Sequence, residues 1–146
     1  MILNKLPSAA GIIVYQTHGT DQLYFLGLIA LPEFQTKNYG IYDIPKGRID
    51  PGESAIQCAI REAYEEATIV ITQFNSEPFT HDRLTVWLAE SYQKPKIGIN
   101  PTTKIQEHLG YEWVTAEQME AQCLDYLKPH IQWARKYIKE MGSAND

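Results

Sequence analysis

A chain of 146 residues with 44% hydrophobic and 21% charged residues has the size and composition of one globular domain, expected to span residues 1–146. A formal net charge of −5 at pH 7 argues against a long nucleic-acid partner, because such partners are usually bound by basic surfaces. The two cysteines give no disulfide framework, no apolar run is long enough to cross a membrane, and residues 1–7 are too short for a signal peptide. These features predict a cytoplasmic protein without a membrane partner.

Strand-like and helix-like segments are mixed along the chain. The sequence pattern predicts strands over residues 10–15, 22–29, 41–44, 69–72, 84–90 and 110–114. A turn over residues 18–21 joins the first two strands. Helices are expected after Ser54, after Thr115 with Gln118 as its capping partner, and over about 129–141. Elements mixed in this way predict an α/β sandwich around a mixed sheet.

The helix after Ser54 has the clearest local signals. Residues 50–53 (Asp-Pro-Gly-Glu) suit a type II turn, with Pro second and Gly third. Ser54 followed three residues later by Gln57 forms a capping box. The residues expected to form an apolar stripe toward the core are Ile56, Ala59, Ile60, Ala63 and Ala67. The glutamates of the helix are expected to lie largely off this stripe.

Three of those glutamates, Glu62, Glu65 and Glu66, lie on one side of the helix at about 100° per residue. Like charges at this spacing repel by about 0.2–0.5 kcal/mol per pair, and Arg61 can reach Glu65 but offsets only part of the repulsion. A cluster that repels itself indicates a missing hard cation, with magnesium as the first candidate. Gly47 has no side chain that would keep backbone away from these carboxylates.

The arrangement of Gly47, Glu53, Arg61-Glu62 and Glu65-Glu66 resembles the signature of the Nudix hydrolases. That signature is Gly-x5-Glu-x7-Arg-Glu-U-x-Glu-Glu-x-Gly-U, where U is a bulky aliphatic residue. Every charged position matches at the right spacing over residues 47–69. The resemblance implies the Nudix fold, an α/β/α sandwich around a mixed β-sheet, over nearly the whole chain.

Two positions depart from the signature. Ala63 is small where a larger aliphatic residue is usual, and Thr68 replaces a Gly that normally ends the helix in a left-handed conformation. A β-branched residue adopts that conformation only with strain. We therefore expect the helix to end differently, with a longer or tighter last turn.

The tripeptide Pro45-Lys46-Gly47, the segments 8–15 and 85–90, and the pair Glu107-His108 resemble the diadenosine tetraphosphate hydrolases of this superfamily. That resemblance implies a small-molecule nucleotide substrate and Mg²⁺-dependent cleavage of a nucleoside diphosphate linked to another moiety. Conversion of diadenosine tetraphosphate to ATP and AMP is the first expectation. The alternatives are hydrolysis of nucleoside triphosphates such as 8-oxo-purine forms, of RNA 5′ ends or of diphosphoinositol polyphosphates, and a non-catalytic nucleotide-binding module.

The resemblance also implies roles for individual residues. Glu62, Glu65 and Glu66 would hold Mg²⁺, or Mn²⁺ in its place, and the carbonyl of Lys46 would be a backbone ligand. A carboxylate must take a proton from the attacking water. Glu107 is the first choice for this base, and Glu62 is the alternative.

Glu53 and Arg61 would orient the metal ligands rather than bind the metal. Lys46 and His108 are expected to contact phosphate, and Lys94, Lys96 and Lys104 could also do so. An adenine needs an apolar or aromatic platform. Candidates for this platform are Tyr42, Phe79, His81 and Tyr111, of which Tyr42 and Tyr111 are the residues chosen.

Overall fold

The computed structural model describes residues 6–19 and 22–144. Its strands are β1 (Ala9–His18), β2 (Gln22–Ala30), β3 (Tyr42–Asp43), β4 (Lys46–Arg48), β5 (Phe79–His81), β6 (Leu84–Glu90) and β7 (His108–Thr115). Its helices are α1 (Pro32–Asn38), α2 (Ala55–Ala67), α3 (Ala116–Gln122) and α4 (Lys128–Ala144), with a short 3-10 helix, η1 (Asp125–Leu127). In this described part, no helix combines the length and the apolar character that a membrane crossing requires.

The strands form one mixed sheet in which β1 is central. β1 pairs in parallel with β6 along most of its length. On its other side, residues 9–11 pair with β4 and residues 15–18 pair with β2, both antiparallel. The remaining neighbours follow in the order β3-β2-β1-β6-β5, with β7 also paired to β2. β2 and β4 therefore pair with opposite ends of β1 and separate near its middle. β3 and β4 lie at this opening between the strands.

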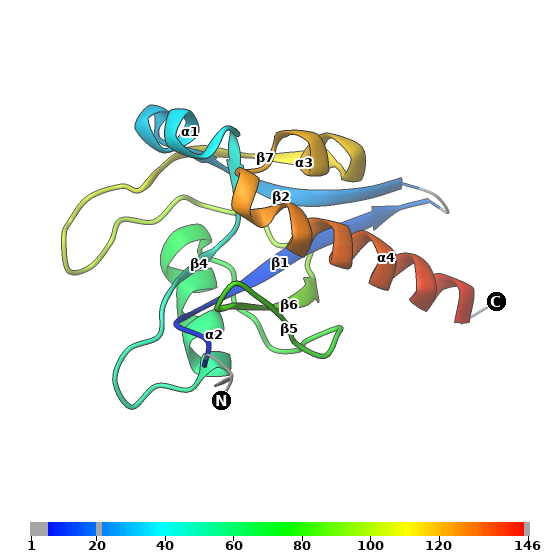
Figure 1. The fold of residues 1–146 in the computed structure, drawn as a ribbon, viewed down its shortest axis with the longest axis horizontal. Coiled ribbons are helices and arrows are strands. Elements are labelled where there is room, and N and C mark those ends of the chain that lie inside the picture. The colour runs from blue at the N-terminus through cyan, green and yellow to red at the C-terminus, as the bar shows by residue number, and fades with distance from the viewer. Residues whose placement is uncertain (1–5, 20–21, 145–146) are drawn as a thin grey trace, which may run out of the picture.

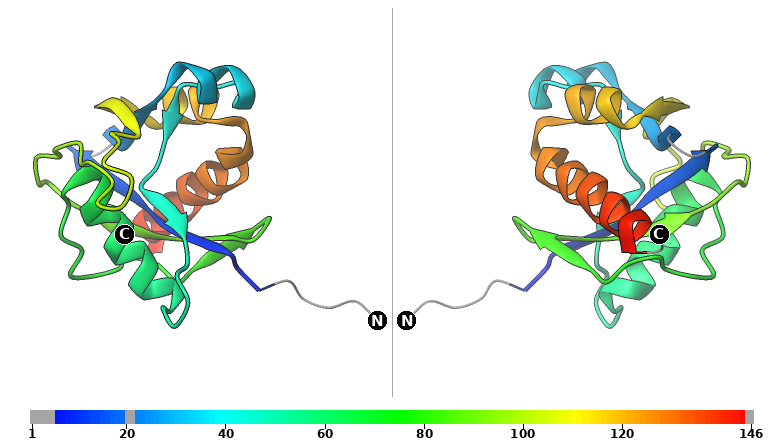
Figure 2. Two further views of the ribbon diagram at one scale, coloured as in Figure 1. Left: turned by 90° about the vertical axis from the view of Figure 1, so that its left-hand side faces the viewer. Right: turned by 90° about the vertical axis from the view of Figure 1, so that its right-hand side faces the viewer.

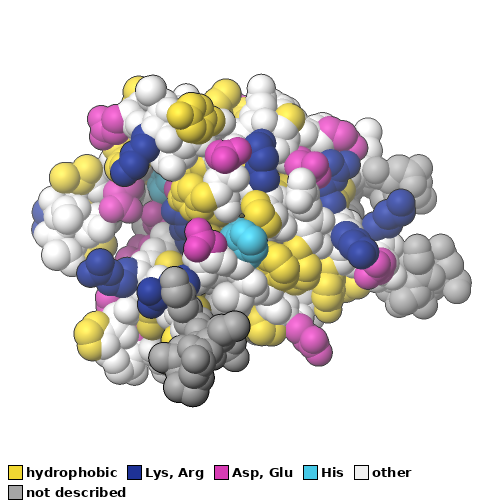
Figure 3. Space-filling model, viewed as in Figure 1, with side chains coloured by type: hydrophobic (Ala, Val, Ile, Leu, Met, Phe, Trp, Pro, Cys, Tyr) yellow, Lys and Arg dark blue, Asp and Glu magenta, His cyan; other side chains and the backbone are white. Residues whose placement is uncertain are grey.

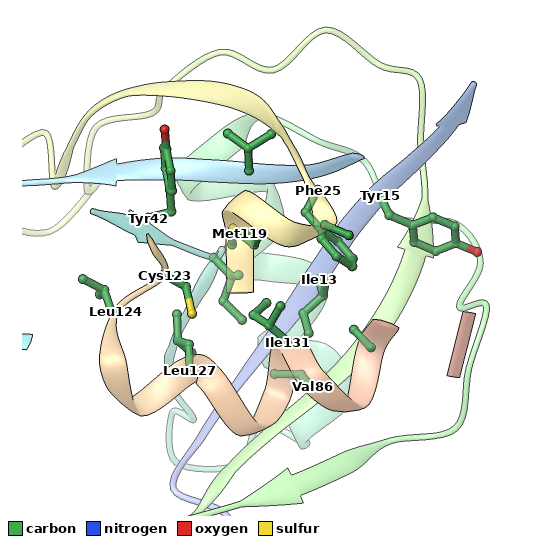
Figure 4. Packing of buried hydrophobic residues seen from close by; sticks show 14 of the residues in the cluster. Ile13, Tyr15, Phe25, Tyr42, Val86, Met119, Cys123, Leu124, Leu127 and Ile131 are labelled. Atoms are coloured by element: carbon green, nitrogen blue, oxygen red, sulfur yellow. The ribbon is translucent and has the colours of Figure 1, made fainter. Parts of the chain in front are cut away.

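Helices cover both faces of the sheet. Figure 2 shows α2 on one side of β1 and α4 on the other, and Figure 1 shows α3 beside α4. Alternate residues of β1 face opposite helices, so Ile13 and Tyr15 belong to the core under α3 and α4, while Ile12 and Val14 belong to the core under α2. Figure 4 shows the first of these cores. The α/β/α sandwich around a mixed sheet expected from the sequence is therefore confirmed.

Most predicted strands are present, and one is absent. The prediction for residues 84–90 coincides with β6, and those for 10–15, 22–29 and 110–114 lie within longer strands. Residues 69–72 were expected to form a strand, but they have no strand partner. The side-chain amide of Gln93 takes that place, because it accepts from the Val70 N–H and donates to the Val70 carbonyl, both at 2.9 Å.

The sequence prediction missed α1, β4 and β5, and part of the 18–21 turn lies outside the described residues. Short elements of this kind carry little periodicity of their own. At the start of α3, the side chain of Thr115 accepts from the N–H of Gln118 at 3.1 Å, as the capping pattern predicts. The last helix is α4, which includes the expected range 129–141 and extends beyond it at both ends.

Helix α2 begins with the predicted capping box of Ser54 and Gln57. Its buried face differs from the predicted stripe, because Ile56 and Ile60 are 45% and 37% exposed. The residues that face the sheet are Cys58, Ala59, Ala63, Ala67 and two of the glutamates, Glu62 and Glu66. Small side chains let the helix approach the sheet closely, so the prediction that the glutamates lie largely off the buried face is wrong for these two.

Helix α2 ends at Thr68, which adopts the left-handed conformation at φ 57° and ψ 35°. The expectation of a different helix end is therefore wrong. The Thr68 N–H donates to the Tyr64 carbonyl at 2.9 Å, and its hydroxyl donates to the Lys96 carbonyl at 2.8 Å. These hydrogen bonds offset the strain that the β-branched side chain brings.

Candidate active site

The carboxylates of α2 meet the backbone of β4. The Lys46 N–H donates to Glu66 Oε1 at 2.8 Å. A Cβ atom at Gly47 would clash with the carboxylate of Glu62, so only glycine allows this approach. The close backbone approach expected at Gly47 is therefore confirmed, and it brings β4 against the acidic side of the helix.

One guanidinium holds three of the glutamates. Arg61 donates to both carboxylate oxygens of Glu53, from Nε at 2.7 Å and from Nη2 at 3.0 Å. Its Nη1 donates to Glu62 Oε1 at 2.9 Å and to Glu65 Oε2 at 3.1 Å. The hydrogen bonds from Arg61 lower the pKa of the Glu53 carboxyl to about 2. This placement suits the orienting role expected of Glu53 and Arg61.

The buried carboxylates of Glu62 and Glu66 have less positive charge around them than their charged forms need. Burial raises the pKa of the Glu62 carboxyl to about 7, and the charges of Glu65 and Glu107 add to the shift although Arg61 opposes it. Burial also raises the pKa of the Glu66 carboxyl well above its usual value, with further contributions from Asp43 and Glu62. A bound cation would stabilise both carboxylates in their charged form.

The acidic residues from two parts of the chain meet at one small cavity. It is lined by Glu62, Glu65, Glu66, Gly98, Asn100, Glu107 and His108. Figure 3 shows acidic side chains gathered in a hollow on the left of the molecule. Glu107 is held there by Asn100, whose Nδ2 donates to Glu107 Oε1 at 3.3 Å. The structure thus brings together the three glutamates expected to bind metal and both candidates for the base, whereas Lys46, whose carbonyl was the fourth expected ligand, is not among the described residues that line this cavity.

The segment between β6 and β7 docks on the end of α2. The Gly98 N–H donates to the Glu66 carbonyl at 3.1 Å, and the Lys96 N–H donates to the Ala67 carbonyl at 2.9 Å. A Cβ at Gly98 would clash with the Glu65 carbonyl, so this contact also requires glycine. Residues 94–104 form a loop, and its docking on α2 was not predicted from the sequence.

The donor set fits a hard divalent cation, since it consists of carboxylate oxygens around one cavity. Within residues 6–19 and 22–144, however, no group of three or more His, Cys, Asp or Glu side chains is already arranged to hold a metal ion. One oxygen each of Glu62 and Glu65 instead accepts a hydrogen bond from Arg61 Nη1. Magnesium usually takes only one or two carboxylates together with water and phosphate oxygens, so it needs no complete protein cage.

A larger cavity of about 310 Å³ adjoins the acidic one and shares Glu66, Glu107 and His108 with it. Its other walls include the aromatic residues Phe34 and Tyr126. A second cavity of about 370 Å³ lies on the other side of Lys46 and Tyr126 and is lined by Arg48 and Arg83 among others. The Lys46 ammonium lies 5.3 Å from the centre of the Tyr126 ring. Both cavities can therefore offer a cation and an aromatic surface to a ligand.

The residues expected to bind substrate are placed unequally. Lys46 and His108 line the cavity of about 310 Å³. Tyr42 is only 4% exposed, and its hydroxyl donates to Glu112 at 2.8 Å, so the stacking role expected for it does not fit its position in the core. Figure 4 shows Tyr42 at the edge of the core cluster. Tyr111 packs against the core under α2, which also argues against a base platform there.

The other aromatic candidates pack against α4. The ring of Phe79 stacks on Trp133, with centroids 5.0 Å apart, and His81 lies edge-on to His130. Two aromatic residues line the cavity of about 310 Å³, namely Phe34 and Tyr126. Both were missed, because neither belongs to a recognisable motif. Asp43 was missed as well, although a single acidic residue in the apolar run 41–44 was a signal that could have been noticed.

This chain belongs to the NUDIX family, because the family model described as NUDIX domain matches residues 5–141. Members of this family are pyrophosphohydrolases that typically use a divalent metal. The chain is 30% identical over 118 residues to the asymmetrical bis(5′-nucleosyl)-tetraphosphatase of Caenorhabditis elegans, covering 75% of this chain and 79% of that protein.

Two further similarities fit this assignment. A crystal structure of a C. elegans Ap4A hydrolase binary complex superposes with a TM-score of 0.67 at 25% identity, covering 92% of this chain and 98% of that one. The chain is also 27% identical over 117 residues to the NAD-capped RNA hydrolase NudC of Photorhabdus laumondii. That match covers 77% of this chain but 42% of NudC.

Proposed function

We propose that this protein is a Mg²⁺-dependent hydrolase that cleaves diadenosine tetraphosphate to ATP and AMP. The observation that carries the proposal is the meeting of Glu62, Glu65, Glu66 and Glu107 at one cavity that opens beside a larger one with cationic and aromatic walls. The similarity to the C. elegans tetraphosphatase supports this substrate over other nucleotides. We further propose that residues 1–146 act as one catalytic domain.

Glu62, Glu65 and Glu66 are the residues that would hold the cation, and Mn²⁺ could replace Mg²⁺ there. The chemistry that such a cation supplies is neutralisation of phosphate oxygens and acidification of a water molecule. Arg61 keeps two of these carboxylates from separating, since it donates to Glu62 and Glu65 at once. Glu53 in turn fixes the guanidinium from the opposite side.

Glu107 is the proposed base. It lies on the wall shared by the two cavities, so it can reach a water placed between the α2 carboxylates and a substrate phosphate. Glu62 is the alternative, because its carboxylate lines the same acidic cavity. Lys46 would attract the phosphates. Phe34 and Tyr126 would provide the apolar surface against which a nucleobase of the substrate stacks.

A product assay over a nucleotide panel tests the proposal. Wild-type protein is incubated with Mg²⁺ and, in separate samples, diadenosine tetraphosphate, 8-oxo-dGTP, NAD-capped RNA or a diphosphoinositol polyphosphate, and the products are separated by chromatography. ATP plus AMP from the first sample, as the preferred reaction by kcat/KM, is the expected result. If 8-oxo-dGTP is instead the preferred substrate and is cleaved to its monophosphate, the protein hydrolyses nucleoside triphosphates rather than diadenosine tetraphosphate. Binding without turnover of any sample would indicate a non-catalytic module.

A pair of matched variants separates this site from the rest of the surface. Glu66→Gln removes one proposed ligand, whereas Glu117→Gln makes the same chemical change on α3, where the side chain of Glu117 is 77% exposed and pairs with Arg135. We expect turnover to be lost in the first variant and kept in the second. Equal activity of the two variants would exclude Glu66 from the mechanism.

A further inference from the structure

The acidic residue Asp43 lies behind the proposed metal ligands and is almost fully buried, with 7% exposure. It belongs to β3, at the opening between the two antiparallel partners of β1. A buried carboxylate is stable only when hydrogen bonds and positive charge compensate its loss of water. The identity of its partners therefore indicates what Asp43 does.

Asp43 has three partners. Its Oδ1 accepts from the Ile44 N–H at 2.8 Å and lies 3.2 Å from Lys46 Nζ, and its Oδ2 is 3.0 Å from His108 Nε2. Burial alone would raise the pKa of the Asp43 carboxyl, but Lys46 and His108 outweigh it and lower that pKa. Asp43 is therefore ionised at neutral pH and can only accept hydrogen bonds. It follows that Nε2 of His108 carries the proton and donates it.

His108 and Lys46 each contact both Asp43 and Glu66. The Nδ1 atom of His108 faces Glu66 Oε2 at 3.8 Å, and the backbone N–H of Lys46 donates to Glu66 Oε1 at 2.8 Å. The imidazole is only 5% exposed, so its orientation is set by Asp43 rather than by water. Asp43, His108, Glu66 and Lys46 come from three separate segments and thus form a closed ring of contacts. One member of this ring is a carboxylate of α2.

We propose that Asp43 is a positioning residue that orients His108 and Lys46 and, through them, keeps the Glu66 carboxylate in place for a divalent cation. The inference rests on the metal-dependent function proposed above. Asp43 itself contributes no oxygen to the acidic cavity, whose described lining residues do not include it. Residues that hydrogen-bond directly to a metal ligand typically change metal affinity by about 10- to 100-fold when they are removed, and Asp43 lies one contact further out and acts on the ligand through such residues.

The test measures cation binding by the full-length protein without nucleotide. Asp43→Asn keeps the size of the side chain but removes its charge. Titration calorimetry with Mg²⁺ or Mn²⁺ alone should show affinity reduced by about 10-fold in this variant, the lower end of the range for direct partners of a metal ligand. The matched control is Glu112→Gln, because Glu112 accepts from the neighbouring Tyr42 hydroxyl and is not among the described residues that line the two cavities of the site. The control should stay within about twofold of wild type. Wild-type affinity in Asp43→Asn would overturn the proposal.

A double-mutant cycle tests the route through His108. The amide of Gln in His108→Gln can still donate to Asp43 but removes the nitrogen that faces Glu66. If Asp43 acts through the imidazole, the effects of Asp43→Asn and His108→Gln on cation affinity will be non-additive. Additive effects, within about twofold, would show that Asp43 does not act through His108 and would overturn the proposal.

A measurement on the wild type covers the case in which Asp43→Asn does not fold. In the metal-free protein, ¹⁵N NMR of the imidazole should find the proton of His108 on Nε2. A proton on Nδ1 alone would contradict the donation to Asp43 and overturn the inference. Failure of the proposed function is distinguishable, because wild-type protein would then bind the cation, with Asp43→Asn weakened, yet cleave no member of the nucleotide panel.

Discussion

The substitution Gly47→Ala would add one methyl group at the point where the β4 backbone meets α2. The new Cβ would clash with the carboxyl carbon and both oxygens of Glu62. That carboxylate is the end of a flexible side chain, so it can turn away, and the cost in stability should be near the lower end of about 1–3 kcal/mol for overpacking. For a chain of this length, 1 kcal/mol lowers Tm by about 2–4 °C.

The loss of activity should be much larger than the loss of stability. Once turned away, Glu62 leaves both its contact with Arg61 Nη1 and the acidic cavity. Displacement of such a group typically costs about 10- to 100-fold in metal affinity or activity. The assay is steady-state hydrolysis of diadenosine tetraphosphate over a range of Mg²⁺ concentrations, with Tm measured on the same samples.

The matched control is Gly110→Ala in β7, where a Cβ would make only an ordinary contact with Ile29 at 3.9 Å. It should keep wild-type kcat and the wild-type dependence on Mg²⁺. If Gly47→Ala has the same kcat and Mg²⁺ dependence as this control, the contact between Gly47 and Glu62 does not hold the site together. The reasoning from the close approach would then be refuted.

Three further predictions concern single residues of the site and of α2. Glu66→Gln should abolish Mg²⁺-dependent turnover with little change in circular dichroism, because an amide oxygen can still accept from the Lys46 N–H. Glu107→Gln should lower kcat more than it raises KM, and an unchanged kcat would move the base to Glu62. Thr68→Ala keeps the left-handed strain but loses the hydroxyl bond to Lys96, so denaturant unfolding should find it about 0.5–1.5 kcal/mol less stable. Thr68→Gly removes the strain as well and should be more stable than the alanine variant, and the reverse order would count against this account of the helix end.

The sequence was a good guide where local chemistry and spacing decide the structure. Ser54 and Gln57 cap α2 as predicted, and the spacing of Glu62, Glu65 and Glu66 along one helix was enough to place them at one cavity. These contacts depend on the helical repeat or on nearest neighbours in the chain. They can therefore be inferred without knowledge of the rest of the fold.

Contacts between distant segments could not be inferred in this way. The periodicity of α2 alone did not reveal that Ile56 and Ile60 would be exposed while Glu62 is buried, because that depends on which strand the helix packs against. The hydrogen bond between Asp43 and His108 joins residues 65 positions apart. Pairing of this kind is set by the order of the strands in the sheet, which no local pattern records.

The docking of residues 96–98 on α2 has a mechanical consequence. Two backbone hydrogen bonds and the Thr68 hydroxyl tether this segment to the helix that carries Glu66, while Glu107 follows on the same loop. One end of the loop is thus fixed to the end of α2, the helix that carries the carboxylates. The other end carries the proposed base. The length of the loop sets how far Glu107 stands from Glu66, so insertions or deletions within residues 101–106 should alter turnover while both glutamates and the Asn100 contact to Glu107 are kept.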